Sequence, residues 1–347
     1  MLRQFFALLA IFILTPSLEA MAQRDICVKV EGLFAFDPLS GWYIEESLEP
    51  VSTYIKAWRE EALDMKLVVT DSLRWGYRHY LGEVDTTLMG RVLSYLGAEL
   101  RGGVDSAFVD SLKYRDLSLF PKDKEFTEFF NSDIEAIKRY FATPLVSFDT
   151  VLRYDPYEYA DFEALFHTFQ REASGADFSI FSPSRLDAAI TEQCFIRNIV
   201  SVLYYDNDLV VVEMSGRELK EYMEEAYSKK FYRVQKVSDD LLRYKVPAFL
   251  FTSLSGVSHT VNLTKPRGKV VENWTLEDSQ IYRVAMNSFL ARDLKIVEIC
   301  GDYKALLIRW LREVEEPLRC RVEADLQPQR IIKEIRKREE ISIIEQL

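Results

Sequence analysis

The sequence predicts an α+β protein, with a smaller mixed α/β region ahead of a larger domain. Short β-branched and aromatic runs alternate with longer segments of helical spacing, and no internal repeat interrupts them. The 347 residues, 48% of them hydrophobic, are sufficient for two modest domains or one large domain. We expect the α/β region at 23–130, the main domain at 131–320 and a charged helical tail at 321–347.

The first residues are typical of a secretory signal peptide at 1–22. Arg3 precedes an apolar run from Phe5 to Leu14, and the small-residue pattern Ala20-Met21-Ala22 follows. This run of ten residues is too short to cross about 30 Å of hydrocarbon, although a membrane anchor is the alternative. We therefore expect an exported protein, periplasmic or secreted, that begins near Gln23 and has no stable membrane span.

In the smaller region the pattern alternates between strand and helix. Strand-like runs cover Ile26–Phe36 and Lys66–Val69, and helical spacing covers Leu48–Asp64 and Thr86–Leu96, which Gly97 ends. Arg101–Asp123 contains paired glycines and several aspartates, so it is predicted to be a loop.

Helical spacing returns at Glu125–Phe141 and Asp161–Ala173. Strands are expected at Phe178–Phe181, Val200–Tyr204, Leu209–Met214, Ala248–Thr252, His259–Leu263 and Tyr282–Met286. Ser215 and Glu218 match a capping box, which predicts a helix from there to near Tyr227. A further helix is expected at Tyr303–Val314, and the tail from Arg330 is predicted to be a charged amphipathic helix.

Composition excludes several classes of function. The 44 basic and 55 acidic residues give a net charge of −11, and no basic run occurs before the tail, so nucleic acid is not an expected partner. The sequence contains no phosphate-binding P-loop, nucleophile elbow or zinc-protease motif. Its four cysteines (Cys27, Cys194, Cys300 and Cys320) form no C-x-x-C pair. They can form disulfides or remain as buried free thiols, and the sequence leaves both alternatives open.

Two stretches carry a specific pattern. Ala176–Tyr222 reads ADFSIFSPSRLDAAITEQCFIRNIVSVLYYDNDLVVVEMSGRELKEY, and Tyr282–Asp293 reads YRVAMNSFLARD. In order and spacing they resemble the C-terminal, nucleotide-binding domain of the 5'-nucleotidase family, with its motifs G-G-I-R, P-F-G-N, T/S-G and Y-x-V-x-x-N-x-F-x-A-G-G-D. The resemblance implies a 5'-nucleotidase C-terminal-like fold, in which this domain selects the substrate and a separate N-terminal metallophosphatase domain hydrolyses it.

The resemblance places an aromatic clamp at Tyr205 and Phe289. Tyr205 stands in the P-F-G-N position, written here Tyr204-Tyr205-Asp206-Asn207, and Phe289 is the aromatic residue of the second motif. Each ring stacked on a base contributes about 1–3 kcal/mol, and the amide of Asn207 can both donate to and accept from a purine edge. The alternative is that both rings are ordinary core residues.

Four further residues complete the implied substrate site. Arg185 stands in the position of the arginine of G-G-I-R, and Arg153 falls loosely near a second family arginine; a guanidinium suits a phosphate, and surface salt bridges are the alternative. Gly256 matches the family's S-G-L, where a side chain would crowd the base. Asp293 stands in for the ribose-binding aspartate.

The sequence departs from the family at three places. Ser182-Pro183-Ser184 replaces the glycines before Arg185, and Asp206 adds a negative charge near the expected anion. Beyond Phe289 the G-G-D-G-Y loop is gone.

The catalytic half is not recognisable. Two-metal hydrolysis uses two cations about 3.5–4 Å apart, which the family holds with D-x-H, G-D, G-N-H-E and G-H-x-H motifs. The three histidines (His79, His167 and His259) belong to no such motif, and Asp71 is the one carboxylate that matches a ligand position. We therefore expect 23–130 to be a degenerate or truncated metallophosphatase-like region, or an unrelated α/β extension, and assign no catalytic residue, metal or other cofactor.

Together these features predict an exported protein that binds a purine nucleotide or nucleoside. It is expected not to hydrolyse the ligand alone, and to complement a separate metallophosphatase chain in nucleotide catabolism. One alternative is a cell-envelope pseudoenzyme that acts as a scaffold. Another is an active 5'-nucleotidase with an atypical metal site, so enzymatic activity stays open.

Overall fold

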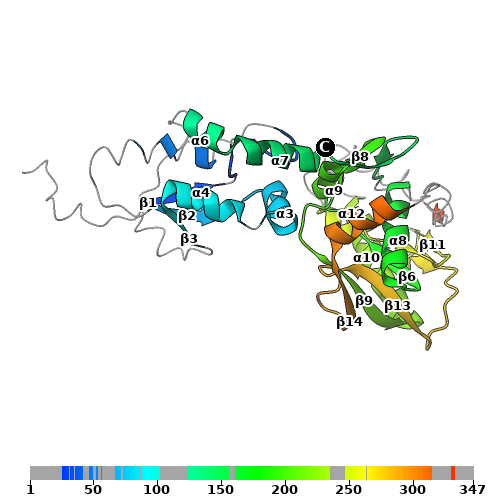
Figure 1. Cartoon of the computed structure of the whole chain (residues 1–347). Helices are drawn as coiled ribbons and strands as arrows, with labels where there is room; N and C mark the ends of the chain where they lie inside the picture. Colours follow the sequence, from blue (N-terminus) through cyan, green and yellow to red (C-terminus); the bar gives the residue numbers. More distant parts are fainter. Residues whose placement is uncertain are drawn as a thin grey trace, which may run out of the picture. The chain divides into compact units, whose positions relative to one another are not determined.

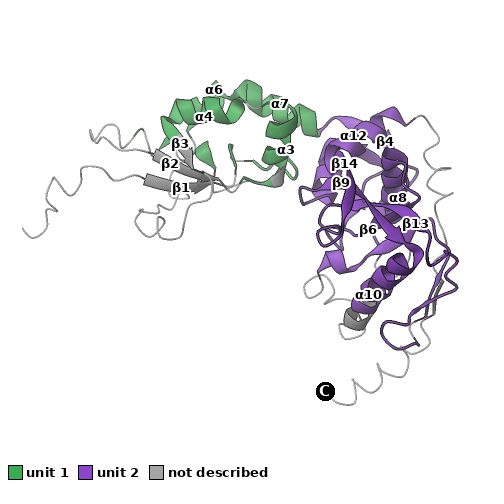
Figure 2. Ribbon diagram, turned by 90° about the horizontal axis from the view of Figure 1, so that it is seen from below, with its two compact units in different colours: residues 1–141 green, residues 142–347 purple. Residues whose placement is uncertain are grey.

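The computed structural model describes residues 26–30, 32–34, 36–41, 47–49, 52–53, 56, 67–71, 73–85, 87–101, 123–155, 161–234, 247–262, 264–314 and 330–332. The predicted signal peptide, the loop at 102–122 and most of the helix expected at Leu48–Asp64 lie outside these residues. The chain divides into two compact units, Met1–Phe141 and Ala142–Leu347 (Figure 2). The division falls at the end of a helix, whereas the sequence analysis placed it after residue 130.

The first unit is built on a three-stranded parallel sheet. Its strands β1 (Ile26–Val30), β2 (Leu67–Asp71) and β3 (Ala98–Arg101) lie in the order β1-β2-β3. The helices are α3 (Trp75–Glu83), α4 (Leu88–Leu96), α6 (Lys124–Phe129) and α7 (Asn131–Phe141). The expected alternation of strand and helix is thus present, and Gly97 ends α4 with a φ of 62° that favours glycine.

Two predictions for this unit were incomplete. The helix expected over Glu125–Phe141 is two helices, because Phe130 leaves helical geometry with a ψ of 12°. The sequence analysis also missed α3, whose polar and aromatic residues give no clear apolar stripe. Aromatic packing holds these helices: the rings of Phe126 and Phe130 each lie 6.0 Å from that of Phe34, a fully buried residue.

The second unit contains a five-stranded sheet of order β10-β6-β13-β9-β14 (Figure 1). These strands are β6 (Phe178–Phe181), β9 (Asp208–Ser215), β10 (Ser253–Ser255), β13 (Ile281–Asn287) and β14 (Ile296–Asp302). β6 and β13 are parallel, and the other neighbouring pairs are antiparallel. The strands predicted at 178–181, 209–214 and 282–286 are confirmed.

Helices cover both faces of this sheet, which explains why β6 is buried along its whole length. Phe178 and Ile180 belong to the core beside α10 (Gly216–Val234), whereas Ser179 and Phe181 contact α8 (Asp161–Ser174) on the opposite face. The helix α12 (Tyr303–Glu313) also contacts α8. The helices predicted at 161–173 and 303–314 are confirmed, and the helix beginning at Ser215 is confirmed but extends to Val234.

Smaller elements surround the sheet. They are β4 (Pro144–Ser147) paired with β8 (Gln193–Phe195), β5 (Leu152–Arg153) paired with β7 (Ala189–Ile190), and β11 (Thr260–Asn262) between β12 (Val271–Glu272) and β15 (Arg330–Ile332). β11 confirms part of the strand predicted at 259–263. Arg330–Ile332 was predicted to begin a helix, but it forms a strand parallel to β11, and its two β-branched isoleucines suit a strand.

Two strand predictions are wrong. Val200–Tyr204 overlaps the last turn of the helix α9 (Ile196–Val202). At the start of that helix, Asn198 Oδ1 accepts from the Phe195 backbone N–H at 2.7 Å, in a capping-box arrangement. Ala248–Thr252 begins with the 3-10 turn η3 (Ala248–Leu250), which follows Pro247.

The described residues give two further findings. None of their helices combines the length and the apolar character needed to cross a membrane. Cys194 and Cys300 are free thiols, and burial raises the pKa of Cys194 to about 12, so that thiol is protonated and unreactive at neutral pH.

Candidate functional site

The segments predicted to bind substrate converge at one end of the five-stranded sheet. The parallel strands β6 and β13 both end there. Since β10 is antiparallel to β6 and β9 is antiparallel to β13, β9 and β10 both begin there. The chain therefore brings the segments that follow Phe181 and Asn287 close to those that precede Asp208 and Ser253. We call this the carboxyl end of the sheet.

Hydrogen bonds join the Tyr205 segment to the Phe289 segment. The backbone N–H of Asp208 donates to Ser288 Oγ at 3.1 Å, and Ser288 N–H donates to the Asp208 carbonyl at 2.9 Å. Ser288 Oγ also lies 3.4 Å from Asn207 Oδ1. Two motifs that lie about eighty residues apart in the sequence are therefore adjacent in the fold.

The same segment is held from the other side by the start of α12. The Tyr303 N–H donates to the Asn207 carbonyl at 3.0 Å, and the Lys304 ammonium forms an ion pair with Asp206. The Lys304 side chain is 2% exposed. The negative charge that distinguishes Asp206 from the family's glycine is therefore offset by a buried cation that the sequence analysis did not identify.

The two predicted clamp residues are both exposed. Tyr205 is 56% exposed and its ring lies edge to face with Tyr204, 5.3 Å between centroids. Phe289 is 39% exposed, and its ring lies 5.4 Å from that of Phe249. The alternative that these rings are core residues is thus wrong, whereas the stacking of one base between Tyr205 and Phe289 stays a prediction.

Arg185 lies on the loop after β6 and forms a bidentate ion pair with Asp187, both contacts being 3.0 Å. Hydrogen bonding to this carboxylate raises the pKa of the Arg185 guanidinium. Arg153 lies exposed on β5, which pairs with β7 at Ala189, four residues beyond Arg185. Arg185 forms the surface ion pair that was the alternative to phosphate binding, and a role toward phosphate stays a prediction for both residues.

Gly256 does not join this group. It follows β10, which runs away from the carboxyl end, and an added Cβ would lie 2.7 Å from the Phe178 ring. Its φ of 95° is also a conformation that favours glycine. The packing of the sheet therefore explains the glycine, and contact with a base stays a prediction.

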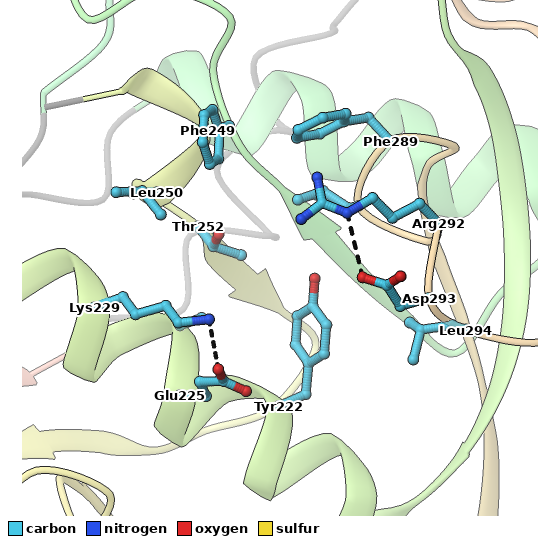
Figure 3. A pocket seen from close by; sticks show the side chains of 12 residues that line it. Tyr222, Glu225, Lys229, Phe249, Leu250, Thr252, Phe289, Arg292, Asp293 and Leu294 are labelled. Carbon is cyan, nitrogen blue, oxygen red and sulfur yellow. Dashed lines mark hydrogen bonds and ion pairs between the residues drawn. The ribbon is translucent and has the colours of Figure 1, made fainter.

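A pocket of about 360 Å³ lies beside Phe289 and includes Asp293 in its lining. Its wall is completed by Phe249 of η3, by the α10 residues Tyr222, Glu225 and Lys229, and by Arg292 (Figure 3). Of the predicted site residues, the structure brings Phe289 and Asp293 into this pocket. The sequence analysis missed Phe249, because 248–252 was interpreted as a strand, and Arg292, although it adjoins Asp293 in the motif.

The described part of the chain contains no group of three or more His, Cys, Asp or Glu side chains arranged to hold a metal ion. His167 and His259 are instead buried and hydrogen-bonded to Ser179 and Tyr227, respectively.

Residues 142–296 match the family model of the 5'-nucleotidase C-terminal domain. This segment, a little under half of the chain, is therefore similar to the C-terminal domain of 5'-nucleotidases. Every residue predicted to bind substrate, from Arg153 to Asp293, lies within the matched segment. The match supports a nucleotide-related role.

Solved structures are similar to more of the chain. A 5'-nucleotidase from Staphylococcus aureus in complex with alpha-ketoglutarate is 14% identical, with a TM-score of 0.48 over 87% of this chain and 62% of that one. A 5'-nucleotidase precursor from Thermus thermophilus is 13% identical, with a TM-score of 0.44 over 86% and 68%, respectively. An NAD nucleotidase from Haemophilus influenzae is 14% identical, with a TM-score of 0.39 over 58% and 40%. The chain thus spans less than two thirds of the Staphylococcus aureus protein, and a search of curated proteins gives no match.

Proposed function

We propose that this protein is exported and binds a purine nucleotide or nucleoside at the carboxyl end of the sheet. The observation that carries the proposal is the hydrogen bonding of the Tyr205 segment to the Phe289 segment, inside the part of the chain that matches the 5'-nucleotidase C-terminal domain. Both rings are partly exposed at a sheet end, where a base can reach them. Arg185, also exposed, is a candidate for contact with the phosphate.

In this proposal the chain supplies substrate selection and does not hydrolyse the nucleotide alone. A separately encoded metallophosphatase would provide the two cations and the attacking hydroxide. The proposal is supported by the sequence, because none of the three histidines stands in a dimetal motif. The residues of the sheet end would bind and orient the nucleotide for that partner.

Calorimetry with AMP, adenosine and a sugar phosphate tests the binding. We expect heat from at least one purine compound and none from the sugar phosphate. Tyr205→Ala and Phe289→Ala should each weaken binding by about 1–3 kcal/mol. Ile281→Ala is the matched control, since Ile281 is 57% exposed at the opposite end of β13.

Two results would reject the proposal. An absence of heat with every purine compound would reject nucleotide binding. Phosphate release from AMP by the purified chain with added divalent metal would instead identify an active nucleotidase with an atypical metal site.

A second candidate, a scaffold protein of the cell envelope, is favoured by the apolar strand β14. Ile299 is 65% exposed there, and Ile296 and Val297 are more than one third exposed, at the border of the sheet. Such a strand can pair with another chain. Co-purification of a stable protein complex from the native cell envelope, together with no purine binding, would support this candidate.

A further inference from the structure

The pocket beside Phe289 contains polar groups that the nucleotide proposal does not use. It is bounded by α10, by η3 with the following Thr252, and by Phe289–Leu294. A volume of about 360 Å³ is in the range of pockets that bind small organic molecules. All of its lining residues belong to the second unit.

Two hydroxyl groups of the pocket have no hydrogen-bond partner among the described residues. Thr252 is 4% exposed as a whole residue and lines the pocket. Tyr222 extends from α10 into the pocket. Burial raises its pKa to about 12, so the hydroxyl stays protonated at neutral pH and can donate a hydrogen bond. Both residues line the pocket, so a bound polar ligand could hydrogen-bond to their hydroxyl groups.

Two cations face the same space. Figure 3 shows the Lys229 ammonium and the Arg292 guanidinium extending into the pocket from different walls, with the Tyr222 hydroxyl between them. Lys229 forms an ion pair with Glu225, at 2.5 Å, and Arg292 pairs through Nε with Asp293, at 3.2 Å. Since an ammonium has three donors and a guanidinium five, both retain donors for an anion.

The remaining wall is aromatic. The Phe249 and Phe289 rings lie 5.4 Å apart and inclined by 70°, and the Arg292 guanidinium lies 4.8 Å from the centre of the Phe289 ring. Stacking on an aromatic ring holds a guanidinium while leaving its donors at the edge free. An apolar ring surface therefore lies next to a cluster of hydrogen-bond donors.

We propose that this pocket binds a small aromatic anion, a phosphate or carboxylate carried on a planar ring. The anionic group lies between Lys229 and Arg292 and accepts from the Tyr222 hydroxyl, and the ring lies against Phe249 and Phe289. The pocket shares Phe289 and Asp293 with the proposed nucleotide site, but its donors Tyr222, Lys229 and Arg292 are not used by that proposal.

Calorimetry on the full chain with phenyl phosphate and benzoate tests the proposal. We expect one or both to bind, and benzyl alcohol and benzamidine, the neutral and cationic analogues, to bind at least about tenfold more weakly. Inorganic phosphate tests whether the ring is needed, and equal affinity for it would overturn the aromatic part of the proposal. Failure of both phenyl phosphate and benzoate to bind would overturn the whole proposal.

Substitutions locate the binding. Tyr222→Phe removes one hydroxyl and keeps the ring, and it should weaken binding roughly fivefold to tenfold, whereas Lys229→Met should weaken it roughly tenfold. Arg217→Met is the control, since Arg217 lies in the first turn of the same helix and outside the pocket. Unchanged affinity in both pocket variants would overturn the assignment.

The two proposals fail separately. If phenyl phosphate binding is lost in Tyr205→Ala but unchanged in Tyr222→Phe, the ligand occupies the nucleotide site and the pocket proposal is wrong. If no purine compound binds but phenyl phosphate binding depends on Tyr222, the nucleotide proposal is wrong and the pocket proposal stands.

Discussion

Lys304 is the residue that connects the start of α12 to the Tyr205 segment. Its side chain is 2% exposed, whereas the Asp206 side chain is 53% exposed. Removing the Asp206 carboxylate is therefore not equivalent to removing the Lys304 ammonium. A carboxylate left alone at the surface can be hydrated, but a buried ammonium that loses its carboxylate cannot be hydrated to the same extent.

We expect Asp206→Asn to lower the free energy of unfolding by about 1–3 kcal/mol, and more than Lys304→Met. Urea unfolding at pH 7 would measure both. If Tyr205 binds a base, both variants should also weaken purine binding, because the ion pair fixes the segment that carries the ring. A larger loss of stability in Lys304→Met would contradict this account of the pair.

Gly256 is constrained by both its conformation and its space. A Cβ would lie 2.7 Å from the Phe178 ring, and φ is 95°. Gly256→Ala should therefore lower the free energy of unfolding by roughly 1–3 kcal/mol. Gly175→Ala is the comparison, since it shares a positive φ but meets no atom within 4 Å, and its loss of stability should be smaller.

At the level of single elements, α10 carries its own start signal. The Ser215 N–H donates to Glu218 Oε2 at 2.8 Å, and the Glu218 N–H donates to Ser215 Oγ at 3.2 Å. Ser215→Ala should cost about 1 kcal/mol in thermal or urea unfolding. Ser258→Ala is the control, because Ser258 is exposed and has no hydrogen bond to the described residues. Equal stability of the two variants would show that the cap contributes little.

Elements with such local signals were the ones that the sequence predicted best. The capping box located α10, and Gly97 located the end of α4, because each depends on neighbouring residues. The Val200–Tyr204 segment was misassigned because its apolar and aromatic residues also suit a strand, and the end of α9 packs its Val200 and Val202 in the core. Distant contacts decided that conformation, and they are not readable from a short window.

The residues of the candidate site could be predicted where they belong to one of the two family motifs. Tyr205, Asn207 and Phe289 were identified by their resemblance to family motifs, and the structure brings their segments together through Ser288. Phe249 and Lys304 were not identified, since they reach the site from η3 and α12, outside both motifs. Residues of that kind become visible only when the sheet order is known.

At the scale of the whole molecule, two buried histidines make the second unit sensitive to pH. His167 of α8 lies 2.8 Å from Ser179 Oγ of β6 and 3.0 Å from Ser253 Oγ of β10, so it joins the helix to two strands. Burial lowers its pKa to about 3. His259 hydrogen-bonds to Tyr227 and to the Val257 carbonyl, and burial lowers its pKa as well.

We expect the second unit to lose stability as the pH falls below about 6.5, the ordinary pKa of histidine. Below that pH the histidines bind protons in the unfolded chain but stay neutral in the folded chain. For His167 alone the loss between pH 7 and pH 5 is about 2 kcal/mol, and it continues toward the folded pKa near 3. His167→Gln retains an amide for the serines but does not titrate, so its stability should change less over this range. Hydrogen exchange at pH 7 and pH 5, corrected for the intrinsic exchange rate, would measure the protection of α8 and β6 in both proteins. An equal pH dependence in the two would exclude His167 as the cause, because the substitution removes its titration and leaves that of His259 in place.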